Sequence, residues 1–220
     1  METKFSVAEE NYIKSIFHLQ EKGGLSTGKL SESLQTKPAS VTDMLKKLKE
    51  KKLIAWSPYK QIKLTAKGKT LALNIIRRHR LWEYFLSEKL HFDWDEVHAV
   101  AEELEHVSSE KLIDKLDAFL HYPRVDPHGD PIPDADGNMQ PRAQLRMADL
   151  PLHTPANIIA VTSQELHLLE LLKHFSISLG TRIEVKKKFE FDESMEVRIS
   201  NKTAIHIGNT ISKSLIVKII

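Results

Sequence analysis

Apolar residues recur at helical spacing through most of the first 120 residues of the chain. The first such stretch ends at Gly23-Gly24, and its apolar face consists of Tyr12, Ile13, Ile16, Phe17 and Leu19. Two shorter helices are predicted next, at 25–34 and 40–52, with a turn at 36–40 between them. The second of these carries five lysines, most of them off its apolar face. A short helix, a tight turn and a basic second helix are typical of a helix-turn-helix.

Residues of alternating character follow at 53–56 and 61–65, separated by a short turn. This pattern predicts a two-stranded hairpin, and a hairpin directly after a recognition helix forms a wing. Helical patterns then return at 65–90 and at 91–120, the second with a break near 107–109. The first half of the chain is therefore predicted to be a winged helix-turn-helix followed by longer helices.

The hydrophobic period changes in the last eighty residues. A proline-rich stretch at 121–141 is predicted to be a connector, with a domain boundary in it or just beyond it. A short helix is predicted at 163–175. Alternating apolar positions predict five short strands, at 156–161, 180–185, 195–199, 204–207 and 215–219. Five short strands within about 65 residues favour a small barrel, so the fold class is α+β.

Composition narrows the possible chemistry. The 220 residues are 41% hydrophobic and 28% charged, enough for one large or two modest domains with real cores. The chain contains no cysteine, which excludes thiol nucleophiles, thiolate zinc sites and CxxC redox motifs. The N-terminal residues lack the apolar core of a signal peptide, and no stretch nears about eighteen uninterrupted apolar residues. We therefore expect a cytoplasmic protein without a membrane span.

The formal net charge of +2 conceals an uneven distribution. Residues 1–80 carry 17 Lys and Arg against 7 Asp and Glu, whereas residues 81–120 carry 3 against 11, and residues 121–220 are balanced. These segments have net charges of +10, −8 and 0. A basic first third indicates a polyanionic partner, and an acidic segment that also contains histidines indicates bound cations.

Metal-ligating residue types coincide with helical spacing in the acidic segment. His98, Glu102, Glu105 and His106 fall within an arc of about 100° on one face of a predicted helix. On the preceding helix, four residues separate His79 from Glu83. Six such N and O donors suit one or two sites for a divalent first-row metal, although a solvated acidic face is the common alternative. The other histidines, His128 included, are interpreted as surface or core residues, with His18 as a partial exception because it lies seven residues after Asn11 on the same helix face.

The predicted turn and recognition helix contain the residues that could reach a DNA duplex. Ser40, Thr42 and Asp43 are the candidates for contacts with bases. Lysines on the recognition helix and wing would contact phosphates. The full set of candidates is Thr36, Lys37, Pro38, Ala39, Ser40, Thr42, Asp43 and Lys47, with Lys60, Lys63, Lys67 and Lys69 from the wing and the helix after it.

Several short motifs together resemble one protein family. They are Glu10-Asn11-Tyr12-Ile13, Pro38-Ala39-Ser40-Val41-Thr42, Leu64-Thr65-Ala66-Lys67-Gly68, Arg78-His79-Arg80-Leu81, Glu105-His106 and His128-Gly129-Asp130-Pro131-Ile132-Pro133. Nearly end to end, the chain resembles the diphtheria-toxin-repressor-like, metal-dependent transcription regulators. The resemblance implies a winged-helix domain at 1–72, a metal-binding and dimerisation domain at 73–141, and a small SH3-like barrel, of the FeoA type, at 142–220.

The resemblance also implies which residues bind metal. The six residues chosen by spacing match family ligands, and Glu102 stands where iron-responsive members resemble one another in having Cys and manganese-responsive members in having Glu. The helix-1 ligand of the family falls at Asn11, so Asn11, Glu10 or a water could take that role. Lys14 stands where some manganese regulators carry Glu. A ligand from the barrel is sought among Gln164, Glu165 and His167.

The sequence thus predicts a homodimeric DNA-binding repressor of metal-uptake genes rather than an enzyme. Its corepressor would be Mn²⁺, with Fe²⁺ as the alternative and other divalent first-row metals possible in vitro. Its operator would be a palindromic DNA duplex with two half-sites about 34 Å apart. Two alternatives stay open, a metal-independent winged-helix regulator and a metallohydrolase, although no HExxH motif or nucleophile elbow is present.

Overall fold

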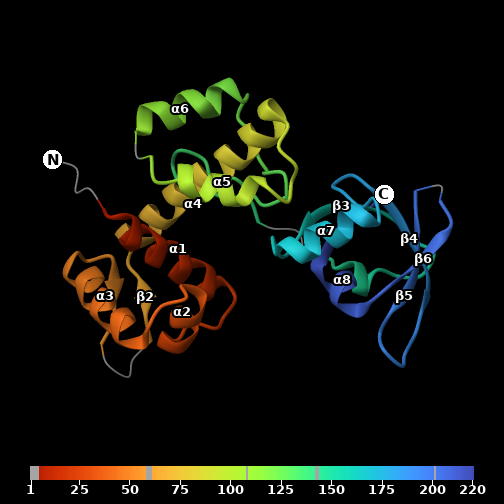
Figure 1. Ribbon diagram of the computed structural model, residues 1–220, viewed down its shortest axis with the longest axis horizontal. Coiled ribbons are helices and arrows are strands. Elements are labelled where there is room, and N and C mark those ends of the chain that lie inside the picture. Colours follow the sequence, from red (N-terminus) through yellow and green to blue (C-terminus); the bar gives the residue numbers. More distant parts are fainter. Residues whose placement is uncertain (1–4, 58–60, 108, 142–143, 201) are drawn as a thin grey trace. The chain divides into compact units, whose positions relative to one another are not determined.

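The computed structural model describes residues 5–57, 61–107, 109–141, 144–200 and 202–220 (Figure 1). These residues form two compact units. The first unit consists of the chain up to His79 with 103–114 and 133–138, and the second consists of 80–102, 115–132 and 139–220. The long helix α4 (Ala66–Leu90), drawn in yellow, passes from the first unit into the second. No helix in the described part of the chain is long and apolar enough to cross a membrane.

Three helices begin the first unit, α1 (Val7–Glu21), α2 (Thr27–Ser33) and α3 (Pro38–Glu50). A capping box starts α1, because the Ser6 hydroxyl accepts from the Glu9 amide and the Glu9 carboxylate accepts from the Ser6 amide. The helix pair α2 and α3 confirms the predicted helix-turn-helix. The three helices share a core in which Ile13, Ile16, Leu30, Leu45 and Leu48 are fully buried.

The recognition helix α3 begins two residues earlier than predicted. Pro38 occupies its first turn, where the missing amide hydrogen costs nothing and the fixed φ suits a helix. Pro38, Ala39 and Ser40 are therefore helical residues and not turn residues. The prediction placed the helix start at Ser40 because serine is a common cap, whereas the residue that precedes the helix here is Lys37.

The predicted wing is present as a short antiparallel pair, β1 (Ile54–Ala55) and β2 (Lys63–Leu64). The strands are shorter than the sequence pattern suggested, and residues 58–60, including the candidate Lys60, lie outside the described residues. Helix α4 starts beside the wing, where Gly68 donates to the Thr65 hydroxyl at 3.1 Å. A Cβ at Gly68 would lie 2.0 Å from the main-chain oxygen of Leu53, so only glycine allows this close approach.

The second unit contains the C-terminal sheet, a five-stranded antiparallel sheet in the order β6-β5-β4-β3-β7 (Figure 1). The sheet has register shifts in β3 and β4 that mark β-bulges, which increase strand twist. Its five strands lie where the alternation predicted them, but helix α8 (Asn209–Ser214) was not predicted. The elements are a 3₁₀ turn η1 (Met147–Asp149), β3 (Pro155–Val161), α7 (Leu166–His174), β4 (Arg182–Lys188), β5 (Met195–Ile199), β6 (Ala204–Ile207) and β7 (Leu215–Ile219).

The predicted helical stretch at 91–120 is shorter in the structure. It consists of α5 (Val97–Leu104) and α6 (Glu110–Phe119), and residues 91–96 are not helical. In that segment, Trp94 packs against the apolar core of the C-terminal sheet, within the same unit.

The proline-rich connector makes a tight turn at 126–131 that lies against β3. Oδ1 of Asp126 accepts from the amides of His128 and Asp130, at 2.8 and 2.9 Å. The main-chain oxygen of His128 accepts from the Val161 amide at 3.0 Å. Gly129 has a φ of +83°, and a Cβ there would lie 2.0 Å from the main-chain oxygen of Ile159. The connector is therefore fixed to the sheet by main-chain contacts.

Candidate metal centre

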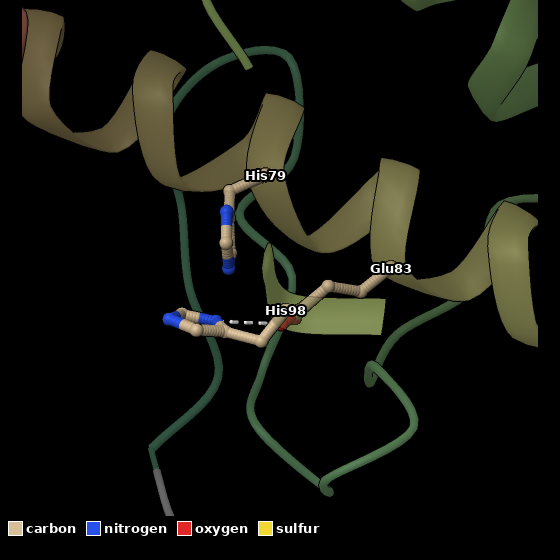
Figure 2. Close-up of side chains that lie close together, drawn as sticks. All are labelled: His79, Glu83 and His98. Carbon is tan, nitrogen blue, oxygen red and sulfur yellow. Dashed lines mark hydrogen bonds and ion pairs between the residues drawn. The ribbon is translucent and has the colours of Figure 1, made fainter. Parts of the chain in front are cut away.

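Glu83 on α4 is the centre of the candidate site, and its side chain is fully buried. His79 lies one turn earlier on the same face of α4, four residues away. Nδ1 of His98, from α5, lies 3.2 Å from Oε1 of Glu83. Figure 2 shows these three side chains, whose ligand atoms all lie within 4.8 Å of one another. Donors on one ion at about 2.1 Å are at most about 4.2 Å apart, so small side-chain shifts would let all three bind one cation.

The environment of His98 favours the protonated imidazole in the metal-free protein. Burial on its own lowers the pKa of His98, but hydrogen bonds and charges from Glu102 and Glu83 outweigh it and raise the pKa to about 9. Nε2 of His98 lies 3.5 Å from Oε1 of Glu102, whose side chain is largely exposed. A metal that binds His98 near neutral pH must therefore displace a proton.

A second group of donors shares Glu83. It consists of Glu83, Asp126 and His128, all three of them buried, and their ligand atoms also lie within 4.8 Å of one another. Oε1 of Glu83 lies 3.8 Å from Nδ1 of His128. All of this group belongs to the second unit, with Asp126 and His128 supplied by the tight turn of the connector.

The hydrogen bonds of His128 determine which ring nitrogen carries a lone pair. Nε2 lies 2.8 Å from the main-chain oxygen of Trp94, which can only accept, so Nε2 carries the hydrogen. Nδ1 then accepts from the side-chain amide of Gln164 at 3.1 Å. A histidine that donates one ring N–H to a main-chain carbonyl is oriented as metal-binding histidines usually are. Nδ1 of His128 is the nitrogen that can bind a cation.

The carboxyl groups of Glu83, Asp126 and Asp130 lie close together in this second group. Burial raises the pKa of Asp126 well above its usual range, and the nearby carboxylates of Glu83 and Asp130 raise it further, while Arg80 acts in the opposite direction. Nε of Arg80 is 3.6 Å from Oδ2 of Asp126, and Nη2 of Arg80 is 3.6 Å from Oδ2 of Asp130. Oδ2 of Asp126 receives no hydrogen bond from the part of the chain that the structure describes. A divalent cation here would favour the ionised carboxylates that burial otherwise disfavours.

The remaining predicted ligands form a separate cluster in the first unit. Oε2 of Glu105 lies 2.7 Å from Nδ1 of His79 and 2.5 Å from Nζ of Lys14. Nδ1 of His106 lies 2.6 Å from Oε2 of Glu10. The helix-1 residue in this cluster is Glu10, which is buried, and its neighbour Asn11 is half-buried. We refer to Glu10, Lys14, Arg78, His79, Glu105 and His106 as the Glu105 cluster.

The three candidate ligands of the C-terminal domain differ in exposure and in the residues that they contact. Gln164 contacts His128, as described above. Glu165 is exposed and precedes α7. His167 is also exposed, and its Nδ1 lies 3.5 Å from Oε2 of Glu170. Of the three, Gln164 is the residue that reaches the donor group around Glu83.

Comparisons with known proteins match all three regions of the chain. Residues 4–62 match the N-terminal DNA-binding domain of the iron dependent repressors, 65–134 match their metal binding and dimerisation domain, and 145–219 match the FeoA domain. A solved manganese-dependent transcriptional repressor in complex with manganese is 31% identical, with a TM-score of 0.85 over 96% of this chain and 100% of that one. The chain belongs to the iron-dependent repressor family.

Curated relatives and further structures agree with this assignment. The iron-dependent repressor IdeR of Mycobacterium leprae is 26% identical over 190 residues, which are 80% of this chain and 83% of IdeR. The diphtheria toxin repressor of Corynebacterium glutamicum is 27% identical over 187 residues, 80% of this chain and 82% of that protein. ScaR with bound Cd²⁺ is 27% identical, with a TM-score of 0.81 over 96% of this chain and 99% of that one. Members of the family are metal-dependent transcriptional repressors and not enzymes.

The candidate DNA-contacting residues lie on the surface of this repressor's first unit. Lys37, Pro38, Ala39, Ser40, Asp43 and Lys47 are exposed on or next to α3, and Lys63 is exposed on β2. Thr42 is half-buried, and its hydroxyl donates to the main-chain oxygen of Pro38 at 3.2 Å. The carboxylate of Asp43 accepts from Lys46 at 3.0 Å. Each of these two side chains thus already makes one contact within α3, while the Thr42 hydroxyl can still accept a hydrogen bond and the second oxygen of Asp43 can accept from a base.

Sequence reasoning did not select Asp126 or His128 as candidate metal ligands. Both residues lie in a connector without helical or strand periodicity, so no spacing rule brings them toward Glu83. One signal was available, since His128-Gly129-Asp130 was among the motifs that carry the family resemblance. Two ligand-type residues around a glycine, next to a proline-rich turn, favour a loop that presents side chains to a site.

Proposed function

We propose that this repressor acts as a homodimer on a palindromic operator and uses Mn²⁺ as the corepressor with which it represses metal-uptake genes. The observation that carries this proposal is the position of Glu83, a fully buried carboxylate shared by two groups of ligand-type side chains. A buried carboxylate beside a second one, Asp126, is costly without a cation. Metal occupancy is therefore expected to change the energetics of this region strongly.

The donor types favour manganese over softer metals. The two groups around Glu83 supply carboxylate oxygens and imidazole nitrogens, and the chain has no thiolate to offer. Carboxylates suit Mn²⁺, whereas a thiolate would favour softer ions, although affinity alone ranks Mn²⁺ below Fe²⁺ and the later metals. The exposed carboxylate of Glu102, 3.5 Å from His98, adds a further oxygen donor. Fe²⁺ is the alternative corepressor.

The residues around Glu83 indicate which side chains would bind the metal and what the bound metal would do. Glu83, Asp126 and His128 would hold the ion, with His98 and His79 as neighbouring donors. When bound, the metal supplies two positive charges and coordination bonds that join α4 to the connector. Binding through His98 would require its deprotonated imidazole, and binding through Nδ1 of His128 would require the lone pair that now accepts from Gln164. Helix α4 runs without a break from its start beside the wing to Glu83. A cation that makes the helix more rigid at Glu83 would therefore also make its first turns, beside the wing, more rigid.

DNA binding by the same protein would depend on the exposed side chains of α3 and the wing. Lysines such as Lys47 and Lys63 supply phosphate contacts and a steep dependence on salt. Ser40, at an exposed place near the start of α3, is the candidate for reading a base edge. Because metal and DNA binding are reciprocal, bound metal is expected to raise operator affinity about 5- to 150-fold.

The decisive experiment is a titration of the dimer with an operator duplex selected in vitro from a random-sequence library. We expect tight binding with Mn²⁺ and weak binding with chelator, and we expect Glu83→Gln to abolish the difference. Glu103→Gln is the matched control, because Glu103 is an exposed glutamate on α5. Equal operator affinity with and without Mn²⁺, Fe²⁺, Co²⁺ and Zn²⁺ would refute the corepressor model. Oligomeric state by light scattering tests the homodimer separately.

A further inference from the structure

The Glu105 cluster contains a positive charge where a metal ion would otherwise be needed. Glu105 is buried, and only 2% of its side chain is exposed. Its Oε2 accepts from Lys14 at 2.5 Å and contacts His79 at 2.7 Å. Nζ of Lys14 also lies 3.4 Å from Nδ1 of His79. The ammonium group of Lys14 thus contacts a carboxylate oxygen and an imidazole nitrogen, two donors that a metal ion at this position would bind.

The other carboxylate of the cluster is also neutralised by the chain. Oε1 of Glu10 accepts from Nη2 of Arg78 at 2.8 Å, and both side chains are nine-tenths buried. Oε2 of Glu10 lies 2.6 Å from Nδ1 of His106. Each carboxylate therefore has a cationic side chain and an imidazole as neighbours. A metal ion could enter only by displacing buried ion pairs, which is costly.

Formal charges distinguish this cluster from the group around Glu83. Glu10 and Glu105 are balanced by Lys14 and Arg78, so the cluster carries no net charge. Around Glu83, by contrast, Asp126 and Asp130 add two carboxylates, and Arg80 is 3.6 Å from each of these. A divalent cation fits a place where three carboxyl groups lie near one guanidinium far better than a place where each carboxylate is already paired with a cationic side chain. Among the described residues, both donor groups compact enough for a metal include Glu83, and neither includes Glu105.

We infer that the ammonium group of Lys14 takes the place of a second metal ion in the Glu105 cluster, so that each chain binds one divalent ion and this ion is bound at Glu83. Lys14 and Glu10 belong to α1, whereas Arg78 and His79 belong to α4. The Glu105 cluster therefore links α1 to α4 within the first unit without any metal. This inference refines the proposed function, and it rests on that proposal for the identity of the ion at Glu83.

The inference is tested by counting ions and not by measuring repression. Wild-type dimer is loaded with Mn²⁺, desalted, and analysed for bound manganese by plasma mass spectrometry, with calorimetric titration for affinities. We expect one equivalent per chain in the wild type. Lys14→Glu removes a positive charge and adds a carboxylate, which takes the cluster from neutral to a deficit of two charges. We expect this variant to gain a second equivalent.

Conservative and matched variants separate charge from folding. Lys14→Arg keeps the cation, and we expect one equivalent, as in the wild type. Lys22→Glu is the same substitution at an exposed lysine just after α1, and we expect it to leave the count unchanged. In single variants that keep Lys14, we expect Glu105→Gln to leave the Mn²⁺ affinity within about threefold of the wild-type value. We expect Glu83→Gln to lower it by about tenfold or more. Circular dichroism melting curves identify any variant that has not folded.

The outcomes distinguish this inference from the proposed function. Two tightly bound equivalents in the wild type, or loss of the single equivalent in Glu105→Gln that still melts cooperatively, would overturn the role of Lys14 and leave the corepressor model intact. No bound metal in the wild type would refute the corepressor model. In that case a gained equivalent in Lys14→Glu would still support the role of Lys14 as a substitute for a metal ion, and no gain would overturn that role.

Discussion

Nε2 of His128 donates to the main-chain oxygen of Trp94 at 2.8 Å. The acceptor is a main-chain atom, so the orientation of the imidazole does not depend on the side chain of Trp94. The Trp94 ring does lie roughly parallel to the imidazole, with ring centroids 6.2 Å apart. The nitrogen that faces Glu83 is thereby kept as an acceptor. A metal ligand whose tautomer is fixed before metal arrives loses less entropy on binding.

Replacing this imidazole tests whether the connector belongs to the site. We expect His128→Gln to lower Mn²⁺ affinity by about 10- to 100-fold, because the amide cannot reproduce the oriented ring nitrogen. Calorimetric titration of the dimer measures the change. His167→Gln is the matched control, since the His167 side chain is 86% exposed and lies beside Glu170. Equal losses in both variants would contradict the assignment.

The pH dependence of metal binding follows from His98. Its pKa of about 9 lies above the usual 6.5, so bound metal competes with a proton at neutral pH. We expect the apparent Mn²⁺ affinity to rise by about tenfold per pH unit between pH 7 and 9 and then to level off. Titrations in buffers of different ionisation enthalpy measure the released proton. His98→Gln should bind more weakly and lose this proton release.

The same shift predicts how the metal-free protein responds to pH. A histidine whose pKa is raised on folding stabilises the protein fully below its unfolded pKa, near 6.5, and this contribution is lost as pH rises through about 9. We therefore expect the Tm in chelator to fall between pH 6.5 and 9. In His98→Gln this part of the pH dependence should be absent. A wild-type Tm that rises over this window would contradict the environment described for His98.

Two glycines with similar backbone angles offer a matched pair of stability tests. Gly129→Ala would place a Cβ 2.0 Å from the main-chain oxygen of Ile159, at a φ of +83°. We expect a loss of about 3 kcal/mol in the free energy of unfolding, from backbone strain and overpacking together. Gly180→Ala has a φ of +79° and open space around the Cβ, so about 1 kcal/mol of strain is expected. Denaturant unfolding measures both.

Two substitutions on α3 separate phosphate contacts from base contacts. We expect Lys47→Ala to weaken binding to all duplexes alike and to reduce the slope of log K against log salt by about 1. Ser40→Ala should instead weaken binding mainly to the selected operator and leave the salt slope unchanged. Fluorescence anisotropy at several salt concentrations measures both effects. A salt slope that is unaffected by Lys47→Ala would place Lys47 away from the phosphates.

Helical periodicity predicted which candidate ligands share a helix face. The pairs His79 with Glu83 and His98 with Glu102 follow from a spacing of four residues, and the structure places each pair on one helix face. The winged helix-turn-helix and the five C-terminal strands were also predictable, because each has its own apolar period. What spacing could not predict is which residues far apart in the chain meet.

Two contacts between residues far apart in the chain show why spacing could not predict them. The turn that brings His128 toward Glu83 is positioned by main-chain contacts with β3, and main-chain contacts leave no hydrophobic pattern in the sequence. Lys14 was visible as a departure from the family pattern, but its role depends on the position of Glu105, 91 residues away. Charge by itself does not reveal this pairing, because the basic segment indicates a polyanionic partner and the acidic segment indicates bound cations.

Glu83 belongs to both compact donor groups, so neither group is complete without its carboxylate. Loss of Glu83 removes an oxygen donor from both groups at once, whereas loss of His98 or of His128 removes a donor from only one of them. An ion that prefers imidazole nitrogens and an ion that prefers carboxylate oxygens would therefore use different neighbours and the same glutamate. Discrimination between metals in this region is then a property of the residues that surround Glu83 and not of Glu83 itself.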